Sequence, residues 1–282
     1  MTAAGRDFLA TMAHSSRARA EAARAREPEA ALRARALATP VAPPLVLDGR
    51  FDLIAELKLR SPAQGLLSTA VDDLERRVTA YADSGAAIVS VLTEPDRFDG
   101  DLLHLARASA ALRPYAVPAM RKDFLVDPYQ LLEARAAGAG GALLIVRMLE
   151  RGALDALARA AADLGLFVLL EAFDEADVAI AAEVAHAWRG RPGDCLVGVN
   201  SRDLVTLEVV PERLEQIAPC LPRAFARVAE SGLATPDDAA RLARAGYTVA
   251  LVGTALMSAA DPRVLGAEMI ARGRSAAPGA PR

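Results

Sequence analysis

The sequence predicts an α/β protein built as a closed (β/α)8 TIM barrel that follows an N-terminal helical extension. Eight short apolar runs begin roughly 22 to 35 residues apart, and a helical segment rich in Ala, Leu and Arg fills each gap. The runs are nearly continuous in Val, Ile, Leu and Ala, which is typical of parallel strands buried on both faces. Eight such units in about 210 residues fit a closed barrel. An open doubly wound sheet would begin with a glycine-rich turn, whereas the first turn here reads LKLRSPAQG.

The first 45 residues predict the helical extension. Residues 6–38 are rich in Ala, Arg, Glu and Leu and indicate one or two amphipathic helices. Prolines at positions 40, 43 and 44 then prevent any continuation of the helix.

The barrel domain is expected over residues 46–272. Its eight predicted strands are 52–58, 86–94, 117–123, 141–146, 166–172, 195–200, 226–231 and 248–253. Pro128 and Thr235 begin two of the intervening helices, and glycines end both of them. A last helix from Pro262 to Arg272 precedes residues 273–282, which are expected to form a disordered tail.

Composition excludes several classes of function. The 282 residues carry a net charge of −3, with both signs interspersed, so a nucleic-acid-binding face is not expected. No apolar run approaches the ~18 residues of a membrane span, and the start lacks the apolar core of a signal peptide. Cys195, Cys220 and the three histidines have no metal-ligand spacing. We therefore expect a cytoplasmic protein without a metal or a membrane partner.

Polar residues mark the ends of seven of the eight predicted strands. In a parallel barrel these ends meet at one mouth, where the active sites of such barrels lie. A single polar residue at a strand end could be ordinary solvation, but seven ends predict a shared site. The residues are Glu56, Lys58, Thr93, Glu94, Lys122, Glu171, Asn200, Glu230, Ser231 and Thr254.

Two lysines are the sharpest signal among these residues. Lys58 and Lys122 are the only lysines among 33 basic residues, and both lie at the predicted mouth. A lysine can change its protonation state, whereas a guanidinium stays charged. Glu171 lies inside an apolar strand and needs a partner, which the lysines can supply. The sequence thus predicts proton chemistry at the mouth.

Glycines after the last two strands indicate a site for an anion. The loops after strands seven and eight commonly bind phosphate in barrels, because backbone N–H groups and a helix N-terminus point at the ligand. Gly232 and Gly253 would allow close approach of the backbone there, and Gly253 runs directly into the short helical segment VGTALM. Either glycine could instead serve only a tight turn.

Six successive motifs resemble those of the indole-3-glycerol phosphate synthase family of tryptophan biosynthesis. They run in order from about residue 45 to 260, and they read IAELKLRSP, VSVLTEPDRFDG, MRKDFLVDPYQLLEARAAGA, VGVNSRDL, VAESGLATPDDAARLARAG and ALVGTALM. The resemblance implies a ring closure without cofactor. The carboxyphenylamino-deoxyribulose phosphate substrate would lose CO2 and water to give indole-3-glycerol phosphate.

The resemblance also implies roles for the polar residues. Lys122 would be the general acid that acts on the substrate carbonyl. Glu171 would be the acid or base of the later dehydration, with Lys58 as its counterpart. Glu56 and Asn200 would hold the substrate and the lysines. The division of acid and base roles among Lys58, Lys122 and Glu171 stays open.

The remaining implied positions bind the substrate. The phosphate would be held by Ser231, Gly232, Gly253 and Thr254, and the carboxylate and ring would lie near Ser61, Arg202 and Glu230, with Phe98 and Phe124 as apolar walls. The expected partner is therefore a small phosphorylated molecule. A monomer is expected, with a dimer left open.

Four positions depart from the usual motifs and keep alternatives open. They are Ala63, Asp101, Ser201 and Thr254, and they leave room for a paralogue that acts on a modified ring in a secondary pathway. Phosphoribosylanthranilate isomerase is another phosphate-binding barrel, but it uses a cysteine at the end of strand one. A Schiff-base aldolase with Lys122 as nucleophile and a non-catalytic scaffold are further alternatives.

Overall fold

The computed structural model describes residues 3–61, 65–66, 73–188, 195–203, 206, 208–210 and 212–279. Eight parallel strands form a closed ring in the order β1-β10-β9-β8-β7-β6-β5-β4, and β4 pairs back onto β1. The strands are β1 (Asp52–Leu57), β4 (Ile88–Leu92), β5 (Ala119–Lys122), β6 (Gly141–Ile145), β7 (Phe167–Ala172), β8 (Cys195–Asn200), β9 (Ala226–Glu230) and β10 (Val249–Val252). Each lies within one of the predicted runs, so the predicted barrel is confirmed.

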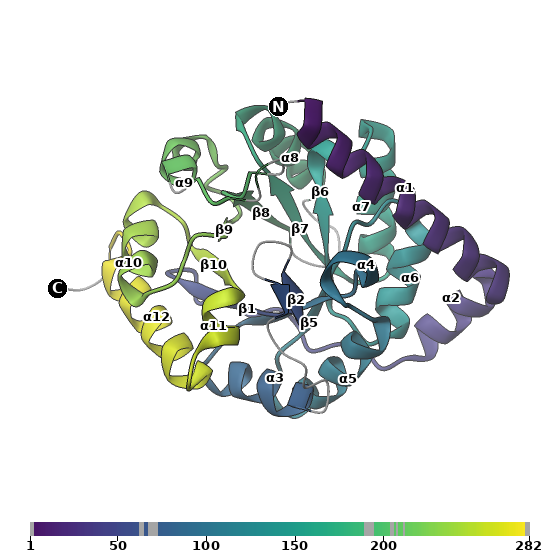
Figure 1. The fold of residues 1–282 in the computed structure, drawn as a ribbon, viewed down its shortest axis with the longest axis horizontal. Helices are drawn as coiled ribbons and strands as arrows, with labels where there is room; N and C mark the ends of the chain where they lie inside the picture. Colours follow the sequence, from purple (N-terminus) through teal and green to yellow (C-terminus); the bar gives the residue numbers. More distant parts are fainter. Residues whose placement is uncertain are drawn as a thin grey trace.

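Helices surround this ring, as Figure 1 shows. The helices after the strands are α3 (Leu74–Asp83), α4 (Pro95–Phe98), α5 (Leu102–Leu112), α6 (Pro128–Ala136), α7 (Arg151–Asp163), α8 (Glu175–Trp188), α9 (Glu212–Ile217), α10 (Pro236–Ala245), α11 (Thr254–Ser258) and α12 (Pro262–Ala276). Short 3-10 turns are η2 (Arg113–Tyr115), η3 (Val146–Met148) and η4 (Ala218–Cys220). A small hairpin of β2 (Arg60–Ser61) and β3 (Gly65–Leu66) follows β1.

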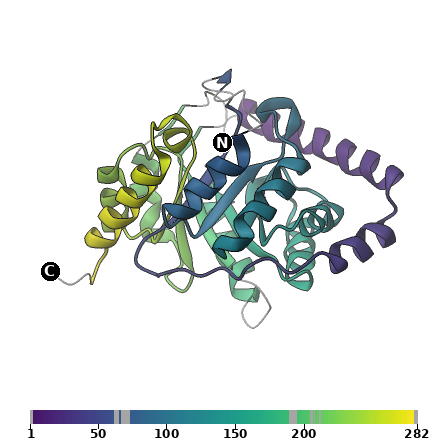
Figure 2. The same ribbon diagram turned by 90° about the horizontal axis from the view of Figure 1, so that it is seen from below.

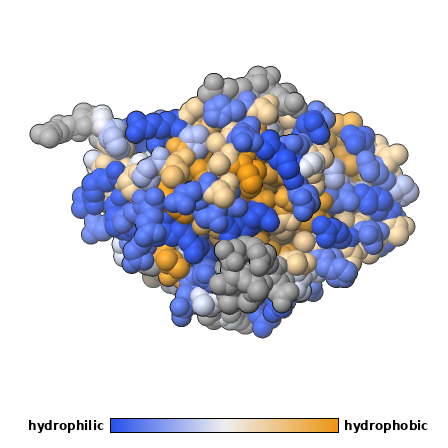
Figure 3. Space-filling model, turned by 90° about the horizontal axis from the view of Figure 1, so that it is seen from above, coloured by the Kyte–Doolittle hydropathy of each residue, from blue (hydrophilic) through white to orange (hydrophobic). Residues whose placement is uncertain are grey.

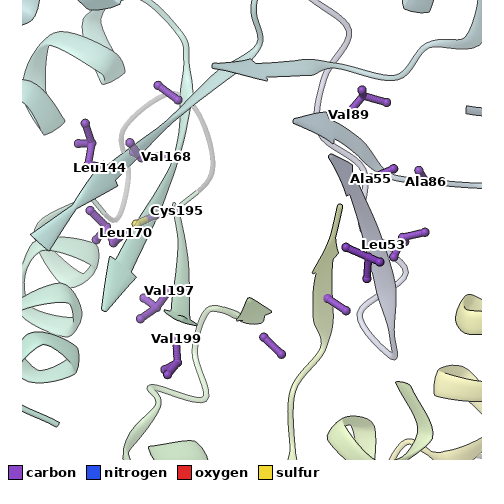
Figure 4. Packing of buried hydrophobic residues seen from close by; sticks show 14 of the residues in the cluster. Leu53, Ala55, Ala86, Val89, Leu144, Val168, Leu170, Cys195, Val197 and Val199 are labelled. Carbon is purple, nitrogen blue, oxygen red and sulfur yellow. The ribbon is translucent and has the colours of Figure 1, made fainter. Parts of the chain in front are cut away.

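The strands are buried on both faces, as their apolar sequence predicts. In β1, Leu53 and Ala55 pack in a cluster with residues of the surrounding helices, whereas Ile54 belongs to a second cluster inside the barrel. Figure 4 shows Leu53, Ala55 and Val89 among the residues of the first cluster. Because side chains alternate along a strand, Glu56 follows Ile54 on the inner face. This alternation brings a charged residue of β1 into the barrel.

The N-terminal extension consists of two helices beside the ring. They are α1 (Ala3–Arg26) and α2 (Glu29–Ala38), separated at Pro28. Figure 2 shows both helices, in purple, along one side of the molecule. Leu32 and Ala36 of α2 pack on Tyr129 of α6, which anchors the extension through an apolar contact.

Helix signals in the sequence act as predicted. Asp127 and Thr235 form capping boxes at the starts of α6 and α10. Gly138 and Gly246 follow the ends of these helices with φ of 83° and 105°, a backbone conformation that favours glycine.

The predicted boundary of the C-terminal tail is wrong by four residues, because α12 continues to Ala276. A Cβ at Gly273 would lie 2.2 Å from Cδ1 of Phe51, so the glycine lets the helix pack directly against this ring. The Arg274 side chain donates to the Phe51 carbonyl at 3.0 Å and to Asp52 at 2.7 Å. These contacts hold the last turn, and residues 280–282 lie outside the described part of the chain.

Within the described residues, none of the helices combines the length and the hydropathy that crossing a membrane requires. Figure 3 shows hydrophilic and apolar residues intermingled on one side of the molecule.

Candidate active site

A cavity of about 340 Å3 opens at the carboxyl ends of the barrel strands. Thirteen of the fourteen residues that the family resemblance assigns to the site line it, namely Glu56, Lys58, Phe98, Lys122, Phe124, Glu171, Asn200, Arg202, Glu230, Ser231, Gly232, Gly253 and Thr254. Thr93 and Glu94, which were also expected at the mouth, are not part of this lining: Thr93 donates to Asp123, and Glu94 caps α4. The fourteenth, Ser61, belongs to β2, and its side chain lies outside the described part of the structure. The barrel thus gathers residues from β1, β5, β7, β8, β9 and β10 around one space.

Lys122 lies between two carboxylates. Its Nζ is 3.0 Å from Glu171 Oε2 and 3.4 Å from Glu230 Oε2. Both glutamates are almost completely buried, whereas Lys122 is partly exposed toward the cavity. The pairing of Glu171 with a lysine was predicted from the sequence, but the contact with Glu230 was not.

Asn200 connects this group to the loop after β9. Its Nδ2 donates to Glu171 Oε1 at 3.2 Å, and its Oδ1 accepts from Ser231 Oγ at 2.9 Å. The backbone N–H of Arg202 donates to the same Oδ1 at 2.9 Å. These bonds fix the orientation of the amide, so Asn200 presents a donor to Glu171.

A second ion pair lies at the carboxyl end of β1. Lys58 Nζ is 2.9 Å from Glu56 Oε1, and both side chains are largely buried. A Cβ at Gly253 would lie 2.3 Å from Glu56 Oε1 and 3.0 Å from Lys58 Nζ. Gly253 therefore leaves space for the ion pair, which is a reason for glycine that the sequence did not reveal.

Electrostatics keep Lys122 charged. Burial alone would lower the pKa of Lys122, but the attraction of the neighbouring acidic groups, Glu171 first and then Glu230 and Glu56, outweighs it and raises that pKa. Burial also opposes ionisation of Glu56, yet the charges of Lys58 and Lys122 hold the pKa of Glu56 below its usual value. Both the lysine and this carboxylate are thus ionised at neutral pH.

The pKa of Glu230 shifts in the opposite direction to that of Glu56. Burial raises the pKa of Glu230 well above its usual value, and the nearby charge of Glu171 raises it further. Its Oε1 is buried without a hydrogen-bond partner among the described residues. Three glutamates face two lysines here, so one proton on Glu230 makes the group neutral. Such a neutral acid is less costly to bury than a third carboxylate.

Aromatic residues form one wall of the cavity. The rings of Phe98 and Phe124 have centroids 6.4 Å apart, and Phe8 of α1 meets Phe124 edge-on at 6.0 Å. Phe8 and Leu9 line the cavity, so the extension does contribute to the mouth. Sequence reasoning missed both residues; their only signal is a pair of large apolar side chains early in an alanine-rich helix.

Asp123, the residue after Lys122, binds α1 to the end of β5. Its carboxylate accepts from Arg19 at 2.8 and 3.1 Å, from Thr93 at 2.8 Å and from Arg121 at 3.1 Å. Burial would raise the pKa of Asp123, but Arg121 and Arg19 lower it to about 2. Arg121 precedes Lys122 in β5, so its side chain points to the opposite face of the strand. There it donates to the Gln130 carbonyl of α6.

The loops predicted to bind phosphate have suitable backbones. Ser231 and Gly232 adopt φ of 68° and 78°, so the chain turns sharply after β9. Thr254 begins α11, and the first N–H groups of a helix lack partners within the helix. The Ser231 hydroxyl itself is engaged by Asn200, which links this loop to the ion pairs.

Comparison with known proteins decides the family. The sequence profile described as indole-3-glycerol phosphate synthase matches residues 10–268. The chain belongs to the indole-3-glycerol phosphate synthase family. This family consists of enzymes that act on a phosphorylated small molecule.

Named relatives of the family are similar over most of the chain. Indole-3-glycerol phosphate synthase of Parafrankia sp. is 41% identical over 224 residues, covering 79% of both chains. The enzyme of the same name from Mycobacterium leprae is 43% identical over 223 residues, covering 78% of this chain and 77% of its own.

Solved structures share the fold alone. Thiamine phosphate pyrophosphorylase from Pyrococcus furiosus is 16% identical with a TM-score of 0.59, covering 81% of this chain and 98% of its own. The 3-hexulose-6-phosphate synthase from Salmonella typhimurium is 15% identical with a TM-score of 0.59, covering 80% of this chain and 99% of its own.

Three of the four departures from the usual synthase motifs lie at described positions. Asp101 caps α5 by accepting from the Leu103 N–H at 2.7 Å. The buried Ser201 hydroxyl donates to the Glu230 carbonyl at 3.2 Å, so it supports the strand end behind the site. Thr254 lines the cavity at the start of α11. Ala63 lies outside the described residues.

Proposed function

We propose that this chain converts 1-(2-carboxyphenylamino)-1-deoxyribulose 5-phosphate to indole-3-glycerol phosphate, with release of CO2 and water and without a cofactor. Membership of the synthase family supports the reaction, and the Lys122–Glu171 pair in the cavity carries the mechanism. The amine makes the aromatic ring electron-rich, so the ring carbon that bears the carboxylate bonds to the substrate carbonyl carbon. CO2 then leaves, and the resulting hydroxyl is lost as water.

Lys122 is the proton donor of the first step in this proposal. Its ammonium stays protonated beside two acidic residues and is partly exposed toward the cavity. As the new bond forms, the carbonyl oxygen becomes an alkoxide, which is a stronger base than an amine. A positioned donor of this kind accelerates such a step by about 10²–10⁴-fold.

Glu171 and Lys58 act in the dehydration. Glu171 is held by Lys122 and Asn200, so its carboxyl has a fixed direction inside the site. Lys58 follows the end of β1 and pairs with Glu56, beside Gly253 and the proposed phosphate loops. One of these groups protonates the leaving hydroxyl and the other removes a proton from the intermediate; Glu56 and Asn200 keep both in place.

The rest of the cavity binds the substrate. Phe98, Phe124 and Phe8 provide apolar surface for the aromatic ring. Arg202 and Ser61 bind the carboxylate of the ring in this proposal. Burial lowers the pKa of Arg202, and the negative charge of Glu56 partly offsets this effect. The phosphate binds the backbone at Ser231, Gly232, Gly253 and Thr254. Holding both ends of one flexible molecule contributes through proximity.

Two alternatives receive less support from the site. A Schiff-base aldolase needs a neutral lysine nucleophile, whereas the ion pair with Glu171 keeps Lys122 charged. Borohydride treatment with substrate present would trap an imine on Lys122 if that alternative applied. The isomerase alternative needs a cysteine at the end of β1, where Glu56, Leu57 and Lys58 stand.

The setting of the enzyme is also proposed. We infer a monomer that works in the cytoplasm, where thiols stay reduced; both Cys195 and Cys220 are free in the structure. Light scattering after size-exclusion chromatography measures the mass of the particle, and a dimer would contradict this inference.

A direct assay tests the proposed reaction. Purified protein is mixed with the carboxyphenylamino substrate, and the appearance of indole fluorescence is followed. Appearance of the product at a rate proportional to enzyme concentration supports the proposal. A substrate bearing a methyl group on the ring, turned over faster than the unmodified one, would instead support a paralogue for a modified ring.

A further inference from the structure

Gly198 of β8 lies at the centre of the acidic cluster around Lys122. In the sheet register it pairs with Glu171 of β7, while Glu230 of β9 pairs with Asn200 two residues further along β8. Side chains alternate along a strand, so Gly198 faces the barrel interior like Asn200. The position between the two glutamates therefore lacks a side chain.

The backbone does not require glycine at this position. Gly198 has no positive φ, unlike Gly232, and it lies inside a regular parallel strand. Glycine in the interior of a strand weakens the strand, and it marks a place where another group approaches closely. The reason for glycine must then be found in what occupies the space.

Glu230 occupies that space. A Cβ at Gly198 would lie 2.4 Å from Glu230 Oε1 and 3.0 Å from Leu169 Cδ1. The leucine contact involves the flexible end of a side chain, whereas the Glu230 carboxyl is buried and its other oxygen contacts Lys122 at 3.4 Å. A methyl group at residue 198 would thus displace the carboxyl of Glu230.

We propose that Gly198 is a positioning residue of the proposed reaction: the missing side chain lets Glu171 and Glu230 converge on the Lys122 ammonium. The inference rests on the proposed role of Lys122 as proton donor. With Glu230 displaced, Lys122 loses one of its two acidic partners, and its Nζ no longer stays at the place where the carbonyl oxygen of the substrate binds.

The first test is Gly198→Ala. We expect kcat to fall about 10²-fold, the size of loss that a displacement of about 1 Å in an active site causes, with KM changed much less. The matched control is Gly141→Ala at the opposite end of the barrel, where a Cβ would lie 2.3 Å from the Phe167 ring. The control should lose stability through the same kind of overpacking and keep its kcat.

The second test separates positioning from a general packing defect. In Gly198→Ala/Glu230→Ala the added methyl group occupies the space that the carboxyl leaves. Gly198→Ala should therefore have no further effect in this background, so the double variant should have the kcat of Glu230→Ala within about twofold, the usual scatter of such comparisons. An equal loss of kcat from Gly198→Ala in both backgrounds, or no loss in the wild-type background, would overturn the proposal.

Folding and the role of Lys122 are controlled separately. If Gly198→Ala alone fails to fold, the double variant should fold, and its failure to do so would also overturn the proposal. Lys122→Met distinguishes the two levels of the argument. If Lys122→Met is inactive and Gly198→Ala is fully active, only the positioning role of Gly198 is overturned. If Lys122→Met is active, the proton-donor role of Lys122, on which the positioning role rests, is overturned.

Discussion

Lys122 Nζ lies 3.0 Å from Glu171 Oε2, although the two residues are on strands separated by β6 and are 49 positions apart. Closure of the barrel and the alternation of side chains bring them together inside the mouth. The pair places a charged donor and a carboxylate next to each other in a cavity with an aromatic wall. This relationship carries the proposed mechanism, and most of the expected effects follow from it.

Glu171→Gln tests the second member of the pair. The amide keeps the shape but cannot take up or release a proton, so kcat should fall about 10²–10⁴-fold while the protein stays folded. Steady-state kinetics and thermal unfolding measure the two effects. Glu183→Gln is the control, because Glu183 pairs with Arg151 on the outside of the barrel. An unchanged rate in Glu171→Gln would move the acid–base role to another residue.

Glu230→Gln tests whether Glu230 is a neutral acid. Because burial raises the pKa of Glu230, its contribution to stability is present at low pH and is lost as pH rises through the folded pKa. Glutamine has no proton to lose. The free energy of unfolding of the variant, relative to wild type, should therefore increase between pH 5 and pH 9, as urea unfolding can measure. A difference that does not change with pH would contradict a raised pKa.

Asp123→Asn tests the attachment of α1. Because the folded pKa of Asp123 is about 2 against a usual 3.8, its ionised form stabilises the fold above pH 4, and this stability is lost as pH falls toward 2. The variant should lose about 2 kcal/mol at pH 7. Urea unfolding at pH 7 and pH 3 should show a smaller difference at pH 3. Equal differences at both values would exclude ionisation as the cause.

Phe8→Ala tests the contribution of α1 to the cavity wall. Phe8 lines the cavity, so its truncation removes apolar surface available to the substrate ring. An aromatic contact worth about 1 kcal/mol corresponds to a rise in KM of about fivefold, with kcat little changed. Leu37→Ala in the exposed part of α2 is the matched control and should leave KM unchanged. If both variants have the wild-type KM, Phe8 does not contact the substrate.

The barrel and the charged centre could be predicted from the sequence because their signals are local. Continuous apolar runs indicate buried parallel strands wherever they lie in a chain. The two lysines stand out because arginine occupies nearly every other basic position. A carboxylate such as Glu171 within an apolar strand must find a buried partner, and the mouth of a barrel is where strand ends meet.

Other parts of the site depend on contacts that no local pattern specifies. Phe8 reaches the mouth only because α1 lies across the end of β5, held by Arg19 and Asp123 across 104 positions. Gly198 and Gly253 look like ordinary glycines until the carboxyls of Glu230 and Glu56 are placed beside them. The sequence predicted disorder for the four residues after Arg272, although they belong to α12. Their small side chains give no local sign that Gly273 packs against the ring of Phe51.

The most direct test of the proposed mechanism is a single-turnover measurement on Lys122→Met with enzyme in excess over substrate. The methionine keeps the bulk of the side chain but has no proton to donate. The proposal predicts that the variant binds the substrate, as calorimetry can show, yet releases CO2 and forms the indole product about 10²–10⁴-fold more slowly than wild type. Release of CO2 and formation of indole at the wild-type rate would contradict the assignment of Lys122 as the proton donor.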